Sequence, residues 1–318
     1  MTLNKLAKKI AVAALALSQL ALPAFADWAP SGPIKLLIGF GAGGGTDTQA
    51  RLLATEIEAR KGWRIIPENM DGAGGAVMAA HLKTLPPDGL TVGLALDSTF
   101  SFASIGNDTL ELGDFTFIVT TAASQTGVIA RKDSGWSTMA DVAAAAQAGE
   151  RIVWNNYSPQ TELASEVIAD KLGIEVNHVR GSGGKSGVDA LVARDANLAW
   201  GGGAQRGLVD AGELVILLSA EDQPLVQNPD GQTVADLGIS STFGFKFVLA
   251  APAGLPDAAR DAIASAVAEV ITDTGTETAA FIAKQYPPAA VVISGEELSR
   301  QLAQQLADNK AMLARFGQ

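Results

Sequence analysis

Short apolar runs and longer helical stretches alternate along this chain, and that alternation constrains the fold more than any other feature. In the first half, a stretch with helical spacing follows a glycine-rich turn at Thr46–Arg60. Strand-like runs surround it at Ile34–Phe40, Trp63–Pro67 and Leu90–Leu96. Strands and helices that alternate at these lengths are typical of a mostly parallel sheet flanked by helices on both faces. We therefore predict an α/β fold.

The same alternation resumes in the second half, so we expect two similar α/β units. The predicted strands there are Arg151–Trp154, Ile174–Val179 and Leu214–Leu218, and a further apolar run follows at Phe245–Ala251. The chain is expected to cross between the units near Thr120–Gln125 and to return near Thr242–Phe245. Such a double crossing makes a hinged pair with a cleft between its halves. We expect lobe 1 to comprise 27–122 plus 245–318, and lobe 2 to comprise 123–244.

Composition narrows the class of function. Of 318 residues, 47% are hydrophobic and 18% are charged, which argues against a disordered chain. The formal net charge of −11 disfavours nucleic acid and anionic lipid surfaces as partners. It leaves a small anionic ligand open, because local backbone dipoles can hold an anion in an acidic protein.

The N-terminus has the pattern of a secretory signal peptide. A basic start at Lys5, Lys8 and Lys9 precedes the apolar run Ile10–Leu22 and the small-x-small site Ala24-Phe25-Ala26. A membrane anchor or a buried helix is the alternative, but the run is short for a membrane span and a cleavage site follows it. We therefore predict that residues 1–26 are removed after Ala26 and that the protein is periplasmic. The chain contains no Cys, so it lacks the residue on which a lipid anchor is built and can form no disulfide.

Two glycine-rich loops in the first half precede helices and suit an anion. Glycines let backbone N–H groups approach a ligand, and a helix start adds unpaired donors and partial positive charge. The expected ligand-binding residues of these loops are Gly43, Gly44, Gly45, Thr46 and Asp47 in the first, and Gly74 and Gly75 in the second. The alternatives are that Thr46 and Asp47 only cap the helix and that the loops are only tight turns.

A dinucleotide-binding enzyme is the main alternative from a different class. Gly39-x-Gly41-x-x-Gly44 matches the dinucleotide fingerprint in spacing and context, and Glu68 ends the next strand. That function would require a cofactor outside the cytoplasm. The only histidines, His81 and His178, lie in no catalytic motif, and no clustered metal ligands occur. We therefore expect a protein that is not an enzyme and has neither cofactor nor metal.

In the second half, two further strand-to-helix turns carry polar side chains. Asn155–Thr161 supplies hydroxyls, amides and an aromatic ring, and Arg180–Lys185 supplies backbone donors and two cations. Each cation could equally be a solvated surface charge. With one residue from the first half, the expected ligand contacts from these segments are Ser98, Tyr157, Ser158, Thr161, Arg180, Ser182 and Gly183.

As an ordered set, several segments resemble those of one known family, the Bug-type solute receptors of tripartite tricarboxylate transporters. The matching segments are Pro33–Ile38, Gly43–Asp47 with Ala50-Arg51, Glu68-Asn69 with Gly72–Gly75, Pro87–Thr91, and Ala251–Pro256. The resemblance implies a two-lobed, hinged fold of the type II periplasmic binding protein class. It also implies ligands that are mostly carboxylates, with one carboxyl group on the first-lobe glycine loops, and a two-component membrane permease as partner.

This chain departs from the family pattern where specificity is expected to lie. Asn156–Glu162 replaces a common Gly-x-Gly-Ser-x-x-His run, and Arg180–Gly183 replaces Pro-Tyr-Lys-Gly. An aromatic ring and a cation are lost, while Arg180 and Lys246 favour a second anionic group on the ligand. The number of carboxylates stays open at this stage.

Three functions therefore remain, namely capture of a small anion for a transporter, ligand sensing for a two-component system, and an exported NAD(P)-dependent oxidoreductase. The first is our prediction, with a monomer as the expected state.

Overall fold

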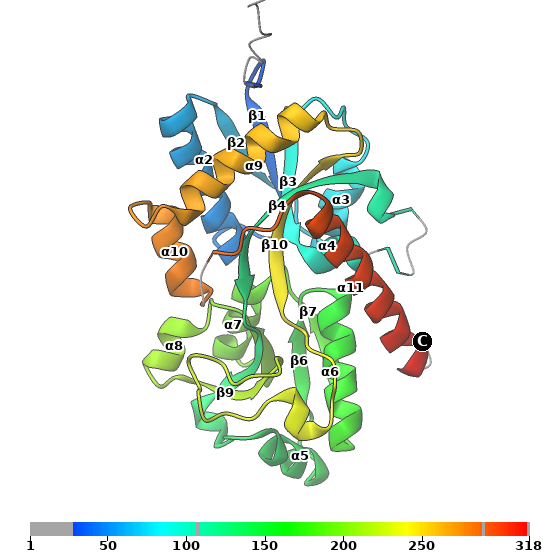
Figure 1. The fold of residues 1–318 in the computed structure, drawn as a ribbon. Coiled ribbons are helices and arrows are strands. Elements are labelled where there is room, and N and C mark those ends of the chain that lie inside the picture. The colour runs from blue at the N-terminus through cyan, green and yellow to red at the C-terminus, as the bar shows by residue number, and fades with distance from the viewer. Residues whose placement is uncertain (1–27, 103, 106–108, 288–289, 317–318) are drawn as a thin grey trace, which may run out of the picture.

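The computed structural model describes residues 28–102, 104–105, 109–287 and 290–316, and these are called the described residues below. The predicted signal peptide, 1–26, lies outside them. The described residues form two lobes, each built around a five-stranded sheet with helices packed against it (Figure 1). The predicted two-lobed α/β architecture is confirmed.

The first sheet has the strand order β2-β1-β3-β10-β4. Its strands are β1 (Ile34–Ile38), β2 (Ile65–Asn69), β3 (Thr91–Leu96), β4 (Phe115–Ser124) and β10 (Phe245–Pro252). β1 pairs in parallel with β2 and β3, whereas β10 runs antiparallel to both β3 and β4. The sheet is therefore mostly parallel, with one strand from the C-terminal part of the chain reversed.

Helices cover both faces of this sheet, as a mostly parallel sheet requires. On one side lie α2 (Gly45–Lys61), α9 (Asp257–Thr272) and α10 (Glu277–Gln285), which contact one another. On the other side lie α3 (Ala76–Leu82), α4 (Asp97–Ser101) and α11 (Gly295–Phe316) (Figure 1). Leu37, Ile38 and Leu94 are fully buried between these layers.

The second sheet has the order β7-β6-β8-β5-β9. Its strands are β5 (Gly127–Arg131), β6 (Val153–Asn156), β7 (Asn177–Arg180), β8 (Leu198–Gly201) and β9 (Leu214–Ser219). Its helices are α5 (Met139–Gln147), α6 (Pro159–Leu172), α7 (Gly184–Ala193) and α8 (Arg206–Asp210). Trp154 and Trp200 stack in its core with ring centroids 5.4 Å apart.

The chain passes between the sheets twice. It leaves the first sheet after β4, which ends at Ser124, and enters the second at Gly127; it returns between β9 and β10. We keep the boundaries 27–122 plus 245–318 and 123–244 as our proposal for the two lobes.

Two strands begin later than the sequence predicted. β2 begins at Ile65 rather than Trp63, because the Trp63 ring packs edge-on against Trp28, with centroids 5.6 Å apart, before the ladder starts. β7 begins at Asn177 rather than Ile174, and Ile174 is a partly buried side chain packed on the core. Apolar runs predicted burial correctly in both places but not the start of strand pairing.

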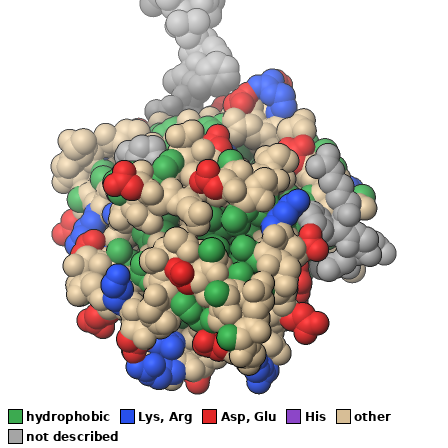
Figure 2. Space-filling view, turned by 90° about the horizontal axis from the view of Figure 1, so that it is seen from below, with side chains coloured by type: hydrophobic (Ala, Val, Ile, Leu, Met, Phe, Trp, Pro, Cys, Tyr) green, Lys and Arg blue, Asp and Glu red, His purple; other side chains and the backbone are tan. Residues whose placement is uncertain are grey.

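No helix built from the described residues is long and apolar enough to cross a membrane. Figure 2 views the molecule from the end of the second lobe, where acidic and basic side chains alternate around hydrophobic ones without a continuous basic patch.

Candidate functional site

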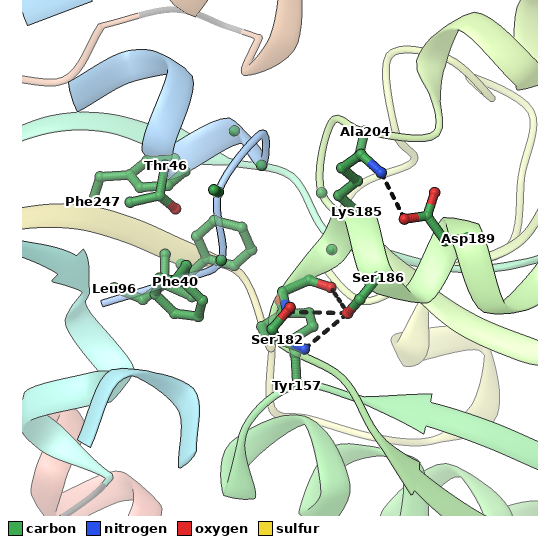
Figure 3. Close-up of a pocket in the computed structure, with 18 of the residues that line it drawn as sticks. Phe40, Thr46, Leu96, Tyr157, Ser182, Lys185, Ser186, Asp189, Ala204 and Phe247 are labelled. Atoms are coloured by element: carbon green, nitrogen blue, oxygen red, sulfur yellow. Dashed lines mark hydrogen bonds and ion pairs between the residues drawn. The ribbon is translucent and has the colours of Figure 1, made fainter. Parts of the chain in front are cut away.

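A cavity of ≈ 140 Å³ lies between the lobes. Its first-lobe wall includes the turn after β1, the first turn of α2, and side chains of β3 and β10. Its second-lobe wall includes Tyr157 and the first turns of α7 (Figure 3). Six of the residues expected from the sequence line it, namely Gly44, Gly45, Thr46, Tyr157, Ser182 and Gly183.

The first turn of α2 offers unpaired donors to this cavity. Gly44 is the N-cap and has no side chain with which to cap the helix. The N–H groups of Gly45 and Thr46 have no acceptor among the described residues, and neither has the Thr46 hydroxyl. The hydroxyl of Tyr286 lies directly over Gly45, where an added Cβ would overlap it. Donors and the positive helix end thus converge on one point, which is an arrangement that binds anions.

Asp47 holds the shape of this loop and does not line the cavity. Its carboxylate accepts hydrogen bonds from Gly43 N (2.9 Å), Arg51 Nε (2.8 Å) and Asn69 Nδ2 (3.0 Å). Burial by itself would raise the pKa of Asp47, but these hydrogen bonds outweigh it and the pKa lies below its ordinary value. The carboxylate is therefore ionised and turned away from the ligand space.

The first turn of α7 faces the cavity from the second lobe. Ser186 Oγ accepts hydrogen bonds from the N–H groups of Ser182 (2.9 Å) and Gly183 (3.2 Å). Lys185 Nζ lies 2.6 Å from Asp189 Oδ2, and both side chains line the cavity (Figure 3). Gly41 N donates to Ser182 O at 3.2 Å, so the loops of the two lobes touch and the arrangement is closed.

Aromatic rings form the rest of the wall. Phe247 lies 4.7 Å from Tyr286 and 5.4 Å from Phe245 between ring centroids, and Phe40 lies 6.3 Å from Tyr157. Both tyrosines are nearly buried, and neither hydroxyl has a hydrogen-bond partner among the described residues. Burial raises the pKa of both phenols, so each is a neutral donor at ordinary pH.

Comparison with known proteins assigns the chain to a family. The family model described as "Tripartite tricarboxylate transporter family receptor" matches residues 49–316. The chain belongs to this receptor family.

Relatives of the receptor support this assignment. A Cupriavidus necator protein, "UPF0065 protein in gbd 5'region", is 29% identical over 250 residues, which cover 77% of this chain and 76% of that protein. The structure of the periplasmic binding protein BugD has a TM-score of 0.81 at 20% identity and covers 91% of this chain and 99% of BugD. MatC from Rhodopseudomonas palustris, with bound malate, has a TM-score of 0.78 at 19% identity and covers 90% of this chain and all of MatC (100%). At these identities the two structures show the shared fold.

In this receptor, the second glycine loop lies beside the cavity rather than in its wall. A Cβ on Gly74 would lie 2.5 Å from Ser158 Cβ, and one on Gly75 would lie 2.8 Å from Thr99 Oγ1. Ser158 and Thr161 form the reciprocal cap of α6, with Thr161 N donating to Ser158 Oγ at 3.2 Å. Ser98 is buried at the start of α4. These predicted contacts, together with Gly43, thus support neighbouring backbone instead of lining the cavity.

The two cations that favoured a second anionic group lie elsewhere. The Arg180 side chain is 83% exposed and pairs with Glu162 at 3.4 Å, outside the cavity wall. Lys246 lines a separate, open space beside Asp97 and α11. Burial raises the pKa of Asp97 to about 6, although the Lys246 ammonium opposes that shift. Neither Arg180 nor Lys246 therefore lies where it could pair with a second anionic group of a ligand in this cavity.

Sequence reasoning missed several lining residues. Phe40, Leu96 and Ala204 carry no motif, and Tyr286 follows α10 far from any glycine loop. Phe245 and Phe247 alternate along β10, a period-2 pattern that would have placed both rings on one face. Tyr286 could be found only from the fold, because nothing near it in the sequence points to α2.

Neither His81 nor His178 is among the described residues that line the cavity. Within the described ranges, no group of three or more His, Cys, Asp or Glu side chains could hold a metal ion. Glu68, which the dinucleotide hypothesis would place on a ribose, pairs with Lys35 at 3.3 Å on the surface. The family assignment is to receptors that bind solutes.

Proposed function

We propose that this receptor captures a small carboxylate in the interlobe cavity and delivers it to the membrane permease of a tripartite tricarboxylate transporter. The observation that carries the proposal is the uncapped first turn of α2, which opens with Thr46 and Tyr286 into a cavity shared by both lobes. A carboxylate there would satisfy the donors of Gly45 and Thr46. The malate bound to MatC is consistent with this ligand class.

The proposal assigns roles to all the residues expected from the sequence. Gly44, Gly45, Thr46, Tyr157, Ser182 and Gly183 contact the ligand. Gly43, Asp47, Gly74, Gly75, Ser98, Ser158 and Thr161 hold the loops that carry those contacts. Arg180 has no contact with the ligand. The protein works without cofactor or catalysis, as a periplasmic monomer that begins at Asp27 after removal of its signal peptide.

A thermal-shift and calorimetry screen of the purified mature chain against small carboxylates, with NAD(P) included, tests the proposal. A ligand at about 100 times its Kd adds ~2.7 kcal/mol of stability, which is readily measured. We expect a shift with a carboxylate and none with NAD(P). A shift with NAD(P) and none with any carboxylate would instead favour the dinucleotide-binding enzyme over carboxylate capture.

The variant Gly44→Val locates the site. A side chain at this N-cap enters the cavity wall beside Gly41 O, so binding should be lost while the circular dichroism spectrum is kept. Gly113→Val is the matched control, because a Cβ there meets nothing within 4 Å. If Gly44→Val binds the carboxylate as tightly as the unaltered protein does, the carboxylate does not bind at this turn.

A further inference from the structure

The two helix ends that face the cavity are electrostatically unlike. At α2 the donors of Gly45, Thr46 and Tyr286 are unpaired among the described residues, and none of the described acidic side chains lines the wall there. At α7 the Lys185 ammonium is already paired with the Asp189 carboxylate at 2.6 Å, and both belong to the wall. Both first turns have N–H groups without an acceptor among the described residues, at Gly45 and Thr46 of α2 and at Gly184 and Lys185 of α7. Only the α7 end also carries a carboxylate, that of Asp189, which disfavours a second anion there.

The space between these ends is small and lined by rings. Its volume of ≈ 140 Å³ is close to the roughly 150 Å³ of an engineered apolar cavity that holds benzene. Phe40, Leu96, Phe245 and Phe247 supply apolar surface. Tyr157, only 7% exposed, lines this space, and its hydroxyl has no hydrogen-bond partner among the described residues, which suits a neutral polar substituent and not a second charge.

We infer that this cavity selects a monocarboxylate whose body is a single ring or an apolar group of that size. The inference rests on the proposed function and deepens it. The carboxylate lies on the first turn of α2 under the Tyr286 hydroxyl, and the body lies among the rings of β10 and Phe40.

The same wall discriminates against two other classes of small carboxylate. The second carboxylate of a dicarboxylate would approach Asp189, with no unpaired cation in the described part of the wall to offset its lost hydration. The ammonium group of an amino acid would find Asp189 already occupied by Lys185.

Calorimetric titration of the mature chain with benzoate, succinate, citrate and aspartate tests this selection. We expect benzoate to bind at least about tenfold more tightly than the other three, because a second charged group would lose hydration among the rings, and a second carboxylate would also lie beside the Asp189 carboxylate. Succinate, citrate or aspartate binding as tightly as benzoate would overturn the inference while leaving carboxylate capture intact. If no carboxylate binds, the proposed function is wrong, and so is this inference.

An Asp189→Asn variant tests the role of the ion pair. The substitution removes the repelling carboxylate and frees Lys185, so the preference for benzoate over succinate should fall about fivefold or more. Asp189 is 61% exposed, and its loss should leave the fold unchanged. Asp170→Asn, which removes the same charge from an exposed position on α6, is the control and should leave the ratio unchanged. An unaltered ratio in Asp189→Asn would overturn the assignment of selectivity to this pair.

Discussion

The two glycine loops of the first lobe look alike in sequence but serve different purposes. In Gly41–Gly45, Gly44 and Gly45 have no backbone conformation that demands glycine, and they leave space for a ligand and for the Tyr286 hydroxyl. In Gly72–Gly75, Gly72, Gly74 and Gly75 have φ of 128°, 65° and 91°, and each is in close contact with a neighbour. Gly44 and Gly45 make room for a ligand and for Tyr286, whereas Gly43, with a φ of 74°, and the glycines of the second loop permit turns, and the second loop also packs closely on its neighbours.

The packed loop also connects the lobes. Thr99 Oγ1 donates to Gly74 O at 2.6 Å from within the first lobe, while Ser158 of the second lobe covers Gly74 from the other side. A change in the first loop should therefore act on the ligand directly, and a change in the second should act on closure.

Among single-methyl changes to the two loops, the largest effect is expected from Gly45→Ala in the ligand-facing loop. The new Cβ would overlap the Tyr286 hydroxyl and force that ring off the first turn of α2. Carboxylate affinity should fall about a hundredfold, because overpacking costs about 1–3 kcal/mol and a hydrogen-bond donor is displaced as well. Calorimetry measures the loss. Gly207→Ala, whose Cβ meets nothing within 4 Å, should bind normally; an equal loss in both variants would contradict a local cause.

Gly74→Ala in the packed loop should have a smaller effect on affinity, of about tenfold. Its Cβ would lie 2.5 Å from Ser158 Cβ at a φ of 65°, so the closed state is strained while the open state can relieve the contact. Small-angle scattering should show a more open average conformation. The second change Ser158→Gly removes the opposing atom and should restore part of the closure. If it does not, the contact does not control closure.

A third kind of glycine, Gly244, lies at the return crossing. The next effect in size is expected from its close neighbour, Glu221. A Cβ on Gly244 would meet the Glu221 carboxylate, which accepts a hydrogen bond from Thr126 N at 3.0 Å beside the first crossing. Burial raises the pKa of Glu221 to about 7; Asp222 and Asp97 add to that shift, and Thr126 N and Lys246 oppose it. The hinge therefore contains a carboxyl group that resists ionisation.

Glu221→Gln should flatten the pH dependence of stability. The folded protein holds the Glu221 proton more tightly than the unfolded chain, so the contribution of Glu221 is full below about pH 4.5 and is lost as pH rises through about 7. Removing it should reduce the decline in unfolding free energy between pH 5 and 7 by about 1–2 kcal/mol. Urea titrations across this range measure the decline. Asp97, whose pKa is about 6, should leave a residual slope; an unchanged slope in the variant would contradict the role of Glu221.

The sequence allowed the fold to be predicted more completely than the site. Alternating apolar runs and helical spacing are local signals, and they led to the two α/β units and to the place where the chain returns, but not to the antiparallel direction of β10. The loop at Gly44–Thr46 was also found, because a helix start and its glycines are neighbours in sequence. Tyr286 was missed, since its position over Gly45 depends on how α10 packs against α2. Gly74 was given a ligand role because its φ and its contact with Ser158 are tertiary properties that no local pattern reveals.

The smallest effect is expected at Arg180, which the sequence favoured as a ligand contact. The side chain is 83% exposed and its pair with Glu162 spans 3.4 Å, a geometry in which ion pairs contribute about 0–1 kcal/mol. Arg180→Ala should therefore change carboxylate affinity by less than about twofold. Lys185→Ala, five residues further on, should weaken binding more, because it leaves the Asp189 carboxylate unpaired in the cavity wall. A tenfold loss in Arg180→Ala with little change in Lys185→Ala would mean that the ligand extends beyond this cavity toward β7, and that a second anionic group is bound there.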